Sequence, residues 1–359
     1  MCIRDSDYID PAQVRTVAQQ RRNLVLIYAE SLEAGYGDAH LFGKDLLAPL
    51  HRLGGRSFAW YRPAAGATWT IAGMVATQCG VPLKVYAQQD MRPRGDGRAF
   101  LPGATCLGDV LRTHGYRSVF LGGVSLSFAG KGRFLRDHGY DETWGLDEWL
   151  RAGAKKEEAN VWGLWDSALF ERATATLDRL HASGQPFNLT LLTLDTHNPA
   201  GFLSPPCRQR GDLSFSGIVA CSADQIAALV RHARERGYLK DTTVVVIGDH
   251  LAMPNPVHET LVQAGERRGM FNLVVGDGLP APNTDQLMPF DFFPTLVELA
   301  GIQVEGDRLG LGYSAVGPAD VRPPPQRAQQ WSLSHVNGSR RYDELWSAGE
   351  ARPAAARVD

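Results

Sequence analysis

The chain has 359 residues, of which 44% are hydrophobic and 21% are charged, so it can bury a large core and lacks the composition of a disordered protein. Its formal net charge of −2 and its pI of about 6.6 provide no overall basic field, which argues against nucleic-acid binding. The longest apolar runs are far shorter than the roughly 20 residues that span a bilayer, and the first residues lack the apolar segment of a secretory signal.

The two ends of the chain carry weak patterns. Met1–Ser6 resembles a leader found on sequences assembled from environmental DNA, and we treat this end as a truncation point. We expect residues 1–17 to be disordered or non-native. Residues 18–315 are expected to form one domain, and residues 316–359 a C-terminal extension that is partly disordered.

Short aliphatic runs alternate with amphipathic stretches along the chain. Five runs predict buried strands: Asn23–Ala29, Ser118–Leu121, Phe187–Leu194, Thr242–Ile247 and Phe271–Val275. Four stretches carry apolar residues at helical spacing: Leu107–Thr113, Trp165–Ala182, Ser222–Arg236 and Phe290–Ala300. The alternation predicts an α/β sandwich with a central, mostly parallel sheet flanked by helices. Ser204–Gly211 is expected to be an exposed loop.

Three predicted strands run into ionisable residues. Glu30 follows the first, Asp195 and His197 follow the third, and the pair Asp249 and His250 follows the fourth. Each alone is often a helix cap or a loop residue. Together they favour a site, because the carboxyl ends of parallel strands meet at one edge of a sheet. Carboxylates with an imidazole suit a divalent metal ion.

Thr70 stands at the predicted start of a helix, Thr70–Thr77, after the small residues that begin at Gly66. Free N–H groups and the helix dipole at such a position favour a phosphoryl group. A nearby divalent metal would lower the pKa of the threonine hydroxyl and turn it into a nucleophile. The alternative is that Thr70 is only an N-cap.

Four internal cysteines form two local sets. Cys79 and Cys106 flank one segment, Cys207 and Cys221 flank another, and Cys2 lies in the leader. This spacing fits two local disulfides in an oxidising compartment, with buried free thiols as the alternative.

Four segments resemble the phosphoglycerol transferase I family of the alkaline phosphatase and sulfatase superfamily, which includes the lipoteichoic acid synthases. These segments are Asn23–Glu33, Thr68–Leu83, Phe187–Pro199 and Gly248–Met253. The resemblance covers roughly residues 23–301 and implies an alkaline phosphatase/sulfatase-like fold for the domain at 18–315. The Cys-x-Pro-x-Arg motif of sulfatases is absent, which favours phosphodiester transfer over sulfate ester hydrolysis.

The resemblance implies roles for individual residues. Glu30, Thr70, Asp249 and His250 would form the metal site, and Thr70 would carry a covalent phosphoglycerol intermediate. Thr68 is its close rival. His197 would face the substrate and orient phosphate or carry a proton, although single histidines are often structural.

A basic loop, Ser127–Arg133, corresponds to a substrate-binding segment in related synthases. Lys131 is the first candidate for a phosphate contact and Arg133 the second. A solvated basic loop is the alternative.

The resemblance further implies a periplasmic enzyme that moves phosphoglycerol from phosphatidylglycerol to an oligosaccharide, with osmoregulated β-glucans as the expected acceptor. One divalent ion is expected, manganese or magnesium, with zinc as the third option. Relatives usually reach the membrane surface through N-terminal helices, which are missing from this sequence. Alternatives are a phosphoethanolamine transferase, a phosphodiesterase, or a non-catalytic glucan- or lipid-binding relative.

Overall fold

The computed structural model describes residues 7–84, 99–318, 323–324, 326–332 and 339–347. A six-stranded sheet lies at its centre, in the order β5-β4-β6-β2-β7-β8. The strands are β2 (Asn23–Ala29), β4 (Arg117–Gly122), β5 (Glu142–Trp144), β6 (Phe187–Leu192), β7 (Thr242–Gly248) and β8 (Asn272–Val275). Neighbours run parallel except β7 and β8, which confirms the mostly parallel sheet.

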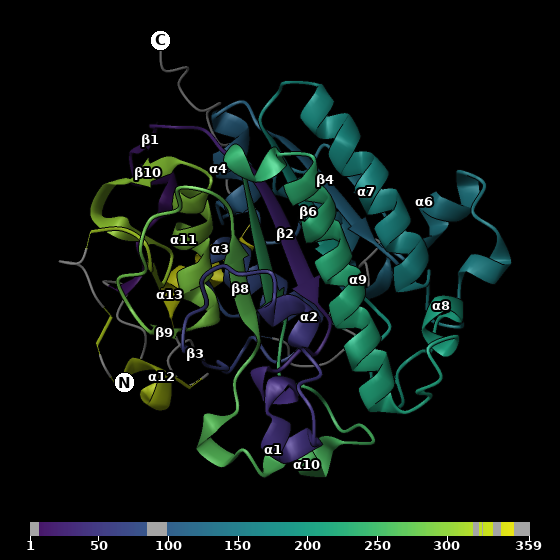
Figure 1. The fold of residues 1–359 in the computed structure, drawn as a ribbon. Helices are drawn as coiled ribbons and strands as arrows, with labels where there is room; N and C mark the ends of the chain where they lie inside the picture. The colour runs from purple at the N-terminus through teal and green to yellow at the C-terminus, as the bar shows by residue number, and fades with distance from the viewer. Residues whose placement is uncertain (1–6, 85–98, 319–322, 325, 333–338, 348–359) are drawn as a thin grey trace.

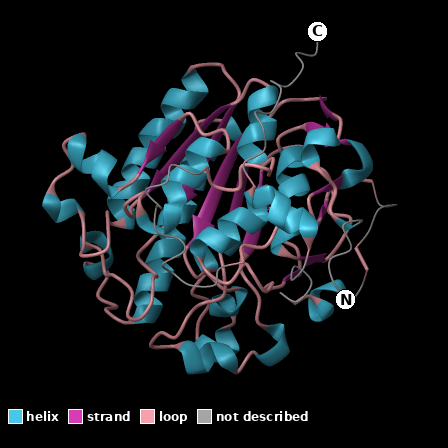
Figure 2. Ribbon diagram, turned by 180° about the vertical axis from the view of Figure 1, so that it is seen from behind, coloured by secondary structure: helices cyan, strands magenta, loops and turns pink. Residues whose placement is uncertain are grey.

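Helices cover both faces of this sheet, as the two opposite views show (Figures 1 and 2). The helices α2 (Ala48–His51), α7 (Asp166–Ala182) and α9 (Phe215–Glu235) share one core with one face of the sheet. The helices α3 (Thr70–Cys79), α4 (Leu107–Thr113) and α11 (Phe292–Leu299) share a second core with the other face. Side chains of β2 alternate between the two cores, so this strand is buried on both sides.

Shorter elements surround the sandwich. The helices are α1 (Ala39–Phe42), α5 (Lys131–Asp137), α6 (Leu146–Arg151), α8 (Pro205–Arg208), α10 (His258–Val262), α12 (Arg327–Gln330) and α13 (Arg340–Trp346). The strands are β1 (Thr16–Ala18), β3 (Trp60–Tyr61), β9 (Gln286–Leu287), β10 (Ile302–Val304), β11 (Arg308–Leu309) and β12 (Gly312–Tyr313).

Most predicted elements are present with bounds within two residues of the prediction, and two segments differ more. The helix expected to start at Ser222 starts at Phe215, because the hydroxyl of Ser214 accepts a hydrogen bond from the backbone N–H of Gly217 and caps it. The loop expected at 204–211 contains the short helix α8, which begins with two prolines at favourable first-turn positions.

Both ends of the described chain pack against the domain. In the expected leader, β1 pairs antiparallel with β10, and Ile9 forms an antiparallel bridge with Gly310. In the C-terminal extension, the backbone N–H of Lys84 donates to the hydroxyl of Tyr342, and Gly103 N–H donates to the carbonyl of Leu345. The expectations for residues 1–6 and 348–359 lie outside the described residues.

Two disulfides link secondary-structure elements. Cys79–Cys106 joins the end of α3 to the start of α4, and Cys207–Cys221 joins α8 to α9. The sequence interpretation of two local bridges is confirmed. The alternative of free thiols is wrong for these four residues.

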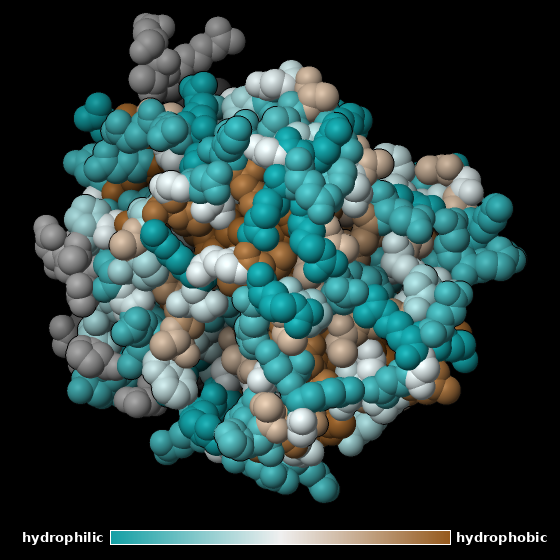
Figure 3. All heavy atoms as spheres, in the orientation of Figure 1, coloured by the Kyte–Doolittle hydropathy of each residue, from teal (hydrophilic) through white to brown (hydrophobic). Residues whose placement is uncertain are grey.

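The outer surface is mixed in character. Figure 3 shows a face dominated by hydrophilic side chains, with smaller apolar areas between them. Among the described residues, no helix combines the length and the apolar composition that a membrane crossing requires.

Candidate active site

Glu30, Asp249 and His250 meet at the carboxyl ends of β2 and β7. These two strands are hydrogen-bonded neighbours, with Ala29 opposite Gly248, so the residues that follow them emerge side by side. Nε2 of His250 lies 3.5 Å from Oε1 of Glu30 and 3.4 Å from Oδ2 of Asp249. All three side chains are buried.

The donor atoms of this cluster point at one another. Nδ1 of His250 donates to the carbonyl of Leu251 at 2.8 Å, which leaves Nε2 facing the carboxylates. Oδ1 of Asp249 accepts two backbone N–H groups, while Oδ2 is buried without a hydrogen-bond partner among the described residues. A buried carboxylate oxygen without a partner is costly, and a divalent cation would satisfy it. The three residues therefore fit a metal ion.

Electrostatics agree with this fit. Burial, together with the nearby charge of Glu30, raises the pKa of Asp249 to about 7. Burial alone would lower the pKa of His250, but the carboxylates of Asp249 and Glu30 outweigh it and raise that pKa. A cation between these groups would relieve the repulsion between the two buried carboxylates.

Ser31 supports the cluster and was missed in the sequence. Its hydroxyl donates to Oε1 of Glu30 at 2.6 Å, and its backbone N–H donates to Oδ1 of Asp249 at 2.8 Å. Both contacts require a sharp turn after β2, where Ser31 adopts a left-handed φ of 53°. The only sequence signal was its position directly after a strand.

Thr70 lies beside the cluster at the first position of α3. Its Oγ1 donates to Oε2 of Glu30 at 3.2 Å, and the N-cap of the helix is Trp69, so the interpretation of Thr70 as an N-cap is wrong. The helix can approach so closely because Gly73 lacks a side chain: a Cβ there would lie 2.1 Å from the carbonyl oxygen of Asp249. Thr68, the rival nucleophile, is exposed and does not line the pocket described next.

A small pocket opens over Thr70. Lys131, expected either in the site or in a solvated loop, lines this pocket and is only 4% exposed. Burial lowers its pKa to about 8, although the carboxylates of Glu30 and Asp249 act in the opposite direction. Arg133 is half-buried and is not among the residues that line the pocket.

His197 forms another part of the pocket wall. It follows β6, and its Nδ1 donates to the carbonyl of Asn198 at 2.6 Å. With Nδ1 engaged as a donor, Nε2 is the ring nitrogen left to exchange a proton with a substrate. Asp195, from the same strand end, does not join the cluster of Glu30, Asp249 and His250.

Asp195 instead pairs with Asp166 at the start of α7. The carboxylate of Asp166 accepts the backbone N–H groups of Leu194, at 2.7 Å, and of Asp195, at 2.9 Å. Burial raises the pKa of Asp166 to about 7, and burial with the nearby Asp166 raises that of Asp195 well above its usual value. This link fixes the segment that carries His197. The sequence indicated only that Asp166 lies near the start of the helix predicted at Trp165–Ala182.

We therefore expect Asp166→Ala to lower the free energy of unfolding by about 2–4 kcal/mol, because two buried N–H groups lose their acceptor. Denaturant unfolding measures this change. Glu171→Ala, at an exposed position of the same helix, is the control and should change stability by less than about 0.5 kcal/mol. Equal stability of the two variants would contradict the structural role of Asp166.

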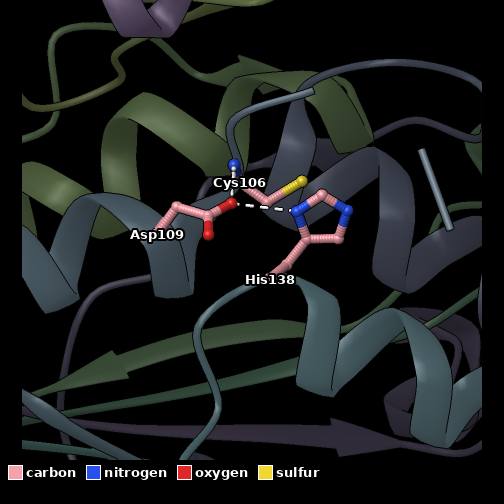
Figure 4. A group of neighbouring side chains, drawn as sticks. All are labelled: Cys106, Asp109 and His138. Carbon is pink, nitrogen blue, oxygen red and sulfur yellow. Dashed lines mark hydrogen bonds and ion pairs between the residues drawn. The ribbon is translucent and has the colours of Figure 1, made fainter. Parts of the chain in front are cut away.

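A second cluster of ligand-type residues does not form a metal site. Cys106, Asp109 and His138 lie close together, as Figure 4 shows. The sulfur of Cys106 is bonded to Cys79 and is not a free thiolate. Oδ2 of Asp109 accepts the N–H of Cys106 and contacts Nδ1 of His138, while Nε2 of His138 contacts the carbonyl of Phe100. These polar atoms already have protein partners and are not available to a metal ion. Their hydrogen bonds instead stabilise the start of α4.

Comparison with known proteins agrees with the fold. A protein-family model described as Sulfatase matches residues 22–302, which is most of the chain. The chain belongs to the sulfatase family. Phosphoglycerol transferase I of Xanthomonas campestris pv. campestris is 39% identical over 316 residues, covering 85% of this chain and 44% of the relative. The resemblance to phosphoglycerol transferase I is thus confirmed, and the chain spans less than half the length of this curated relative.

Solved structures of this sulfatase-family fold are more distant in sequence. Lipoteichoic acid synthase LtaP from Listeria monocytogenes has a TM-score of 0.66 at 15% identity, over 85% of this chain and 79% of that one. The C-terminal periplasmic domain of EptC from Escherichia coli, in a complex with Zn, has a TM-score of 0.60 at 12% identity, over 88% and 92%. These similarities support the alkaline phosphatase/sulfatase-like sandwich.

Proposed function

We propose that this chain is the catalytic domain of a periplasmic, metal-dependent transferase that moves phosphoglycerol from phosphatidylglycerol to a β-glucan. The observation that carries the proposal is the contact of Thr70 with Glu30, two residues that line the pocket, beside the buried Asp249 and His250. The curated relatives named phosphoglycerol transferase I support the choice of the transferred group. The two disulfides fit an oxidising compartment.

A divalent cation held by Glu30, Asp249 and His250, with Thr70 beside them, would lower the pKa of the threonine hydroxyl and offset phosphoryl charge. We expect the metal ion to be manganese or magnesium, with zinc as the third option. The hydrogen bond from Thr70 to Glu30 turns a lone pair of Oγ1 away from Glu30 and toward the pocket.

Two displacements follow from the arrangement of the residues. First, the hydroxyl of Thr70 passes its proton to Oε2 of Glu30 while Oγ1 forms a bond to phosphorus. The bond to the diacylglycerol oxygen breaks, and a protonated His197 donates a proton to that leaving oxygen. Second, Nε2 of His197 takes the proton of a sugar hydroxyl and the sugar oxygen bonds to phosphorus. The bond from phosphorus to Oγ1 of Thr70 breaks, and Oγ1 regains its proton from Glu30. The ammonium group of Lys131 balances the charge of the phosphodiester in both steps.

We expect Lys131→Met, which keeps a similar shape without charge, to raise KM for the lipid donor roughly tenfold or more. Because the pKa of Lys131 is lowered to about 8, the wild-type enzyme should also lose donor affinity as the pH rises through this value. Steady-state kinetics between pH 6.5 and 9.5 measure both effects. The donor affinity of Lys131→Met should not fall with rising pH in this range. Arg133→Met is the control, and a KM increase equal to that of Lys131→Met would contradict the assignment.

The proposed function is tested by incubating the protein with phosphatidylglycerol vesicles and manganese and then measuring the intact mass and the modified peptide. A glycerol phosphate adduct on Thr70 that disappears when β-glucan is added is the expected result. An ethanolamine phosphate adduct formed from phosphatidylethanolamine instead would favour a phosphoethanolamine transferase. Lipid cleavage without transfer to the glucan would favour a phosphodiesterase, and no adduct or cleavage would favour a binding protein.

A further inference from the structure

Trp162 stands on a tight turn that the proposed chemistry does not use. Oδ1 of Asn160 accepts the backbone N–H groups of Trp162, at 2.7 Å, and of Gly163, at 3.0 Å. The backbone N–H of Asn160 donates to the carbonyl of Gly163 at 2.7 Å. Gly163 lies against Gly123, where a Cβ would come within 2.5 Å of the carbonyl oxygen of Gly123. The turn is therefore held firmly against the body of the domain.

The indole ring of Trp162 borders the pocket next to His197. The centroids of these two rings lie 5.2 Å apart, and the ring of Phe128 meets Trp162 edge-on at 5.5 Å. Trp162 and Phe128 are 36% and 47% exposed, although large aromatic side chains are usually buried. Both rings line the same pocket as Thr70. An exposed aromatic surface thus leads directly to the reacting groups.

We propose that Trp162, with Phe128 beside it, is the stacking platform for a pyranose ring of the acceptor oligosaccharide. The C–H groups on one face of a pyranose ring are apolar and weakly positive, and they pack on the electron-rich face of an indole. A sugar seated there would present a hydroxyl near His197, which takes the acceptor proton in the second displacement. The inference rests on the proposed function and adds the subsite that selects a sugar acceptor over water.

A membrane contact is the other reading of an exposed aromatic residue, and three observations disfavour it. Val161, next to Trp162, is 96% exposed, but it is a single aliphatic residue, whereas membrane insertion needs a larger apolar face. The nearby exposed residues Lys155, Lys156 and Glu157 carry charges of both signs. The ring of Trp162 also faces the pocket and contacts His197 instead of extending away from the domain.

The test measures glucan binding without turnover. Calorimetric titration of the Thr70→Ala protein with a purified linear β-glucan oligosaccharide gives the affinity in the parent. Trp162→Leu and Trp162→Phe are then compared in the same background, because both fill space but only phenylalanine keeps an aromatic face. We expect Trp162→Leu to weaken binding at least about tenfold, and Trp162→Phe to weaken it less. Val161→Ser, on the same turn, is the control and should bind as the parent does.

Three outcomes would overturn the platform: no glucan binding by the parent, unchanged affinity in Trp162→Leu, or equal weakening by leucine and phenylalanine. If Trp162→Leu and Val161→Ser co-sediment less with phosphatidylglycerol vesicles while their glucan affinity is unchanged, the turn contacts the membrane instead of the glucan. The adduct on Thr70, measured in the wild type with lipid alone, reports separately on the proposed function. Glucan binding without an adduct would refute the transferase and retain the platform.

Discussion

Replacing Thr70 with alanine is expected to reduce turnover of phosphatidylglycerol by at least about a thousandfold and to abolish the covalent adduct. Oγ1 of Thr70 donates to Oε2 of Glu30 and lines the pocket, whereas Ser31, whose hydroxyl also donates to Glu30, is not among the residues that line it. Thr193 is the other threonine among the described residues that line the pocket. Its hydroxyl oxygen accepts the backbone N–H of Glu30, and it does not stand at the start of a helix. Release of diacylglycerol and intact-protein mass measure the effect.

Two matched variants sharpen this experiment. Thr70→Ser keeps the hydroxyl and should retain a measurable fraction of the activity and of the adduct. Thr68→Ala removes an exposed hydroxyl of the same segment and should leave both nearly unchanged. A persistent adduct in Thr70→Ala, located on Thr68, would show that the nucleophile is wrongly assigned.

The second large effect is expected at the metal-binding residues. Asp249→Asn should weaken divalent cation binding by at least about a hundredfold and reduce turnover in parallel, because Oδ2 of Asp249 is a buried carboxylate oxygen that has no hydrogen-bond partner among the described residues. His250→Ala removes a nitrogen that faces both carboxylates and should have a similar effect. Calorimetric titration with Mn²⁺ and metal analysis of the dialysed protein measure this loss.

The second cluster of ligand-type residues provides the control for that experiment. Asp109→Asn changes a carboxylate that already bonds to the backbone of Cys106 and to His138, so the amount of metal bound per chain should not change. Removal of metal from the wild type with EDTA should abolish turnover, and added Mn²⁺ should restore it. Full metal content in Asp249→Asn and His250→Ala would refute the assignment of the site.

Several parts of the fold could be predicted from the sequence because they depend on local patterns. β2 is an uninterrupted apolar run, and such a run in this context predicts a strand buried on both faces. α4 has the predicted bounds, Leu107–Thr113, since its apolar spacing is regular. The start of α9 was misplaced because the cap at Ser214 precedes the clearest part of the periodic pattern.

Only part of the candidate site could be predicted from the sequence. Glu30, Asp249 and His250 could be grouped because parallel strands place their carboxyl ends at one edge of the sheet. Lys131 was predicted from the resemblance as the first candidate for a phosphate contact, with a solvated loop as the alternative. Only the packing around α5 shows that it is buried.

The sequence by itself determined the strand and helix pattern, the order of the ionisable strand ends and the resemblance to a family, because all of these are properties of neighbouring residues. Tertiary structure alone decided that Thr70 rather than Thr68 reaches Glu30, that Asp166 holds the segment of His197, and that Trp162 borders the pocket. Each of these contacts joins residues distant in the sequence, and no local pattern encodes a distance across the folded chain.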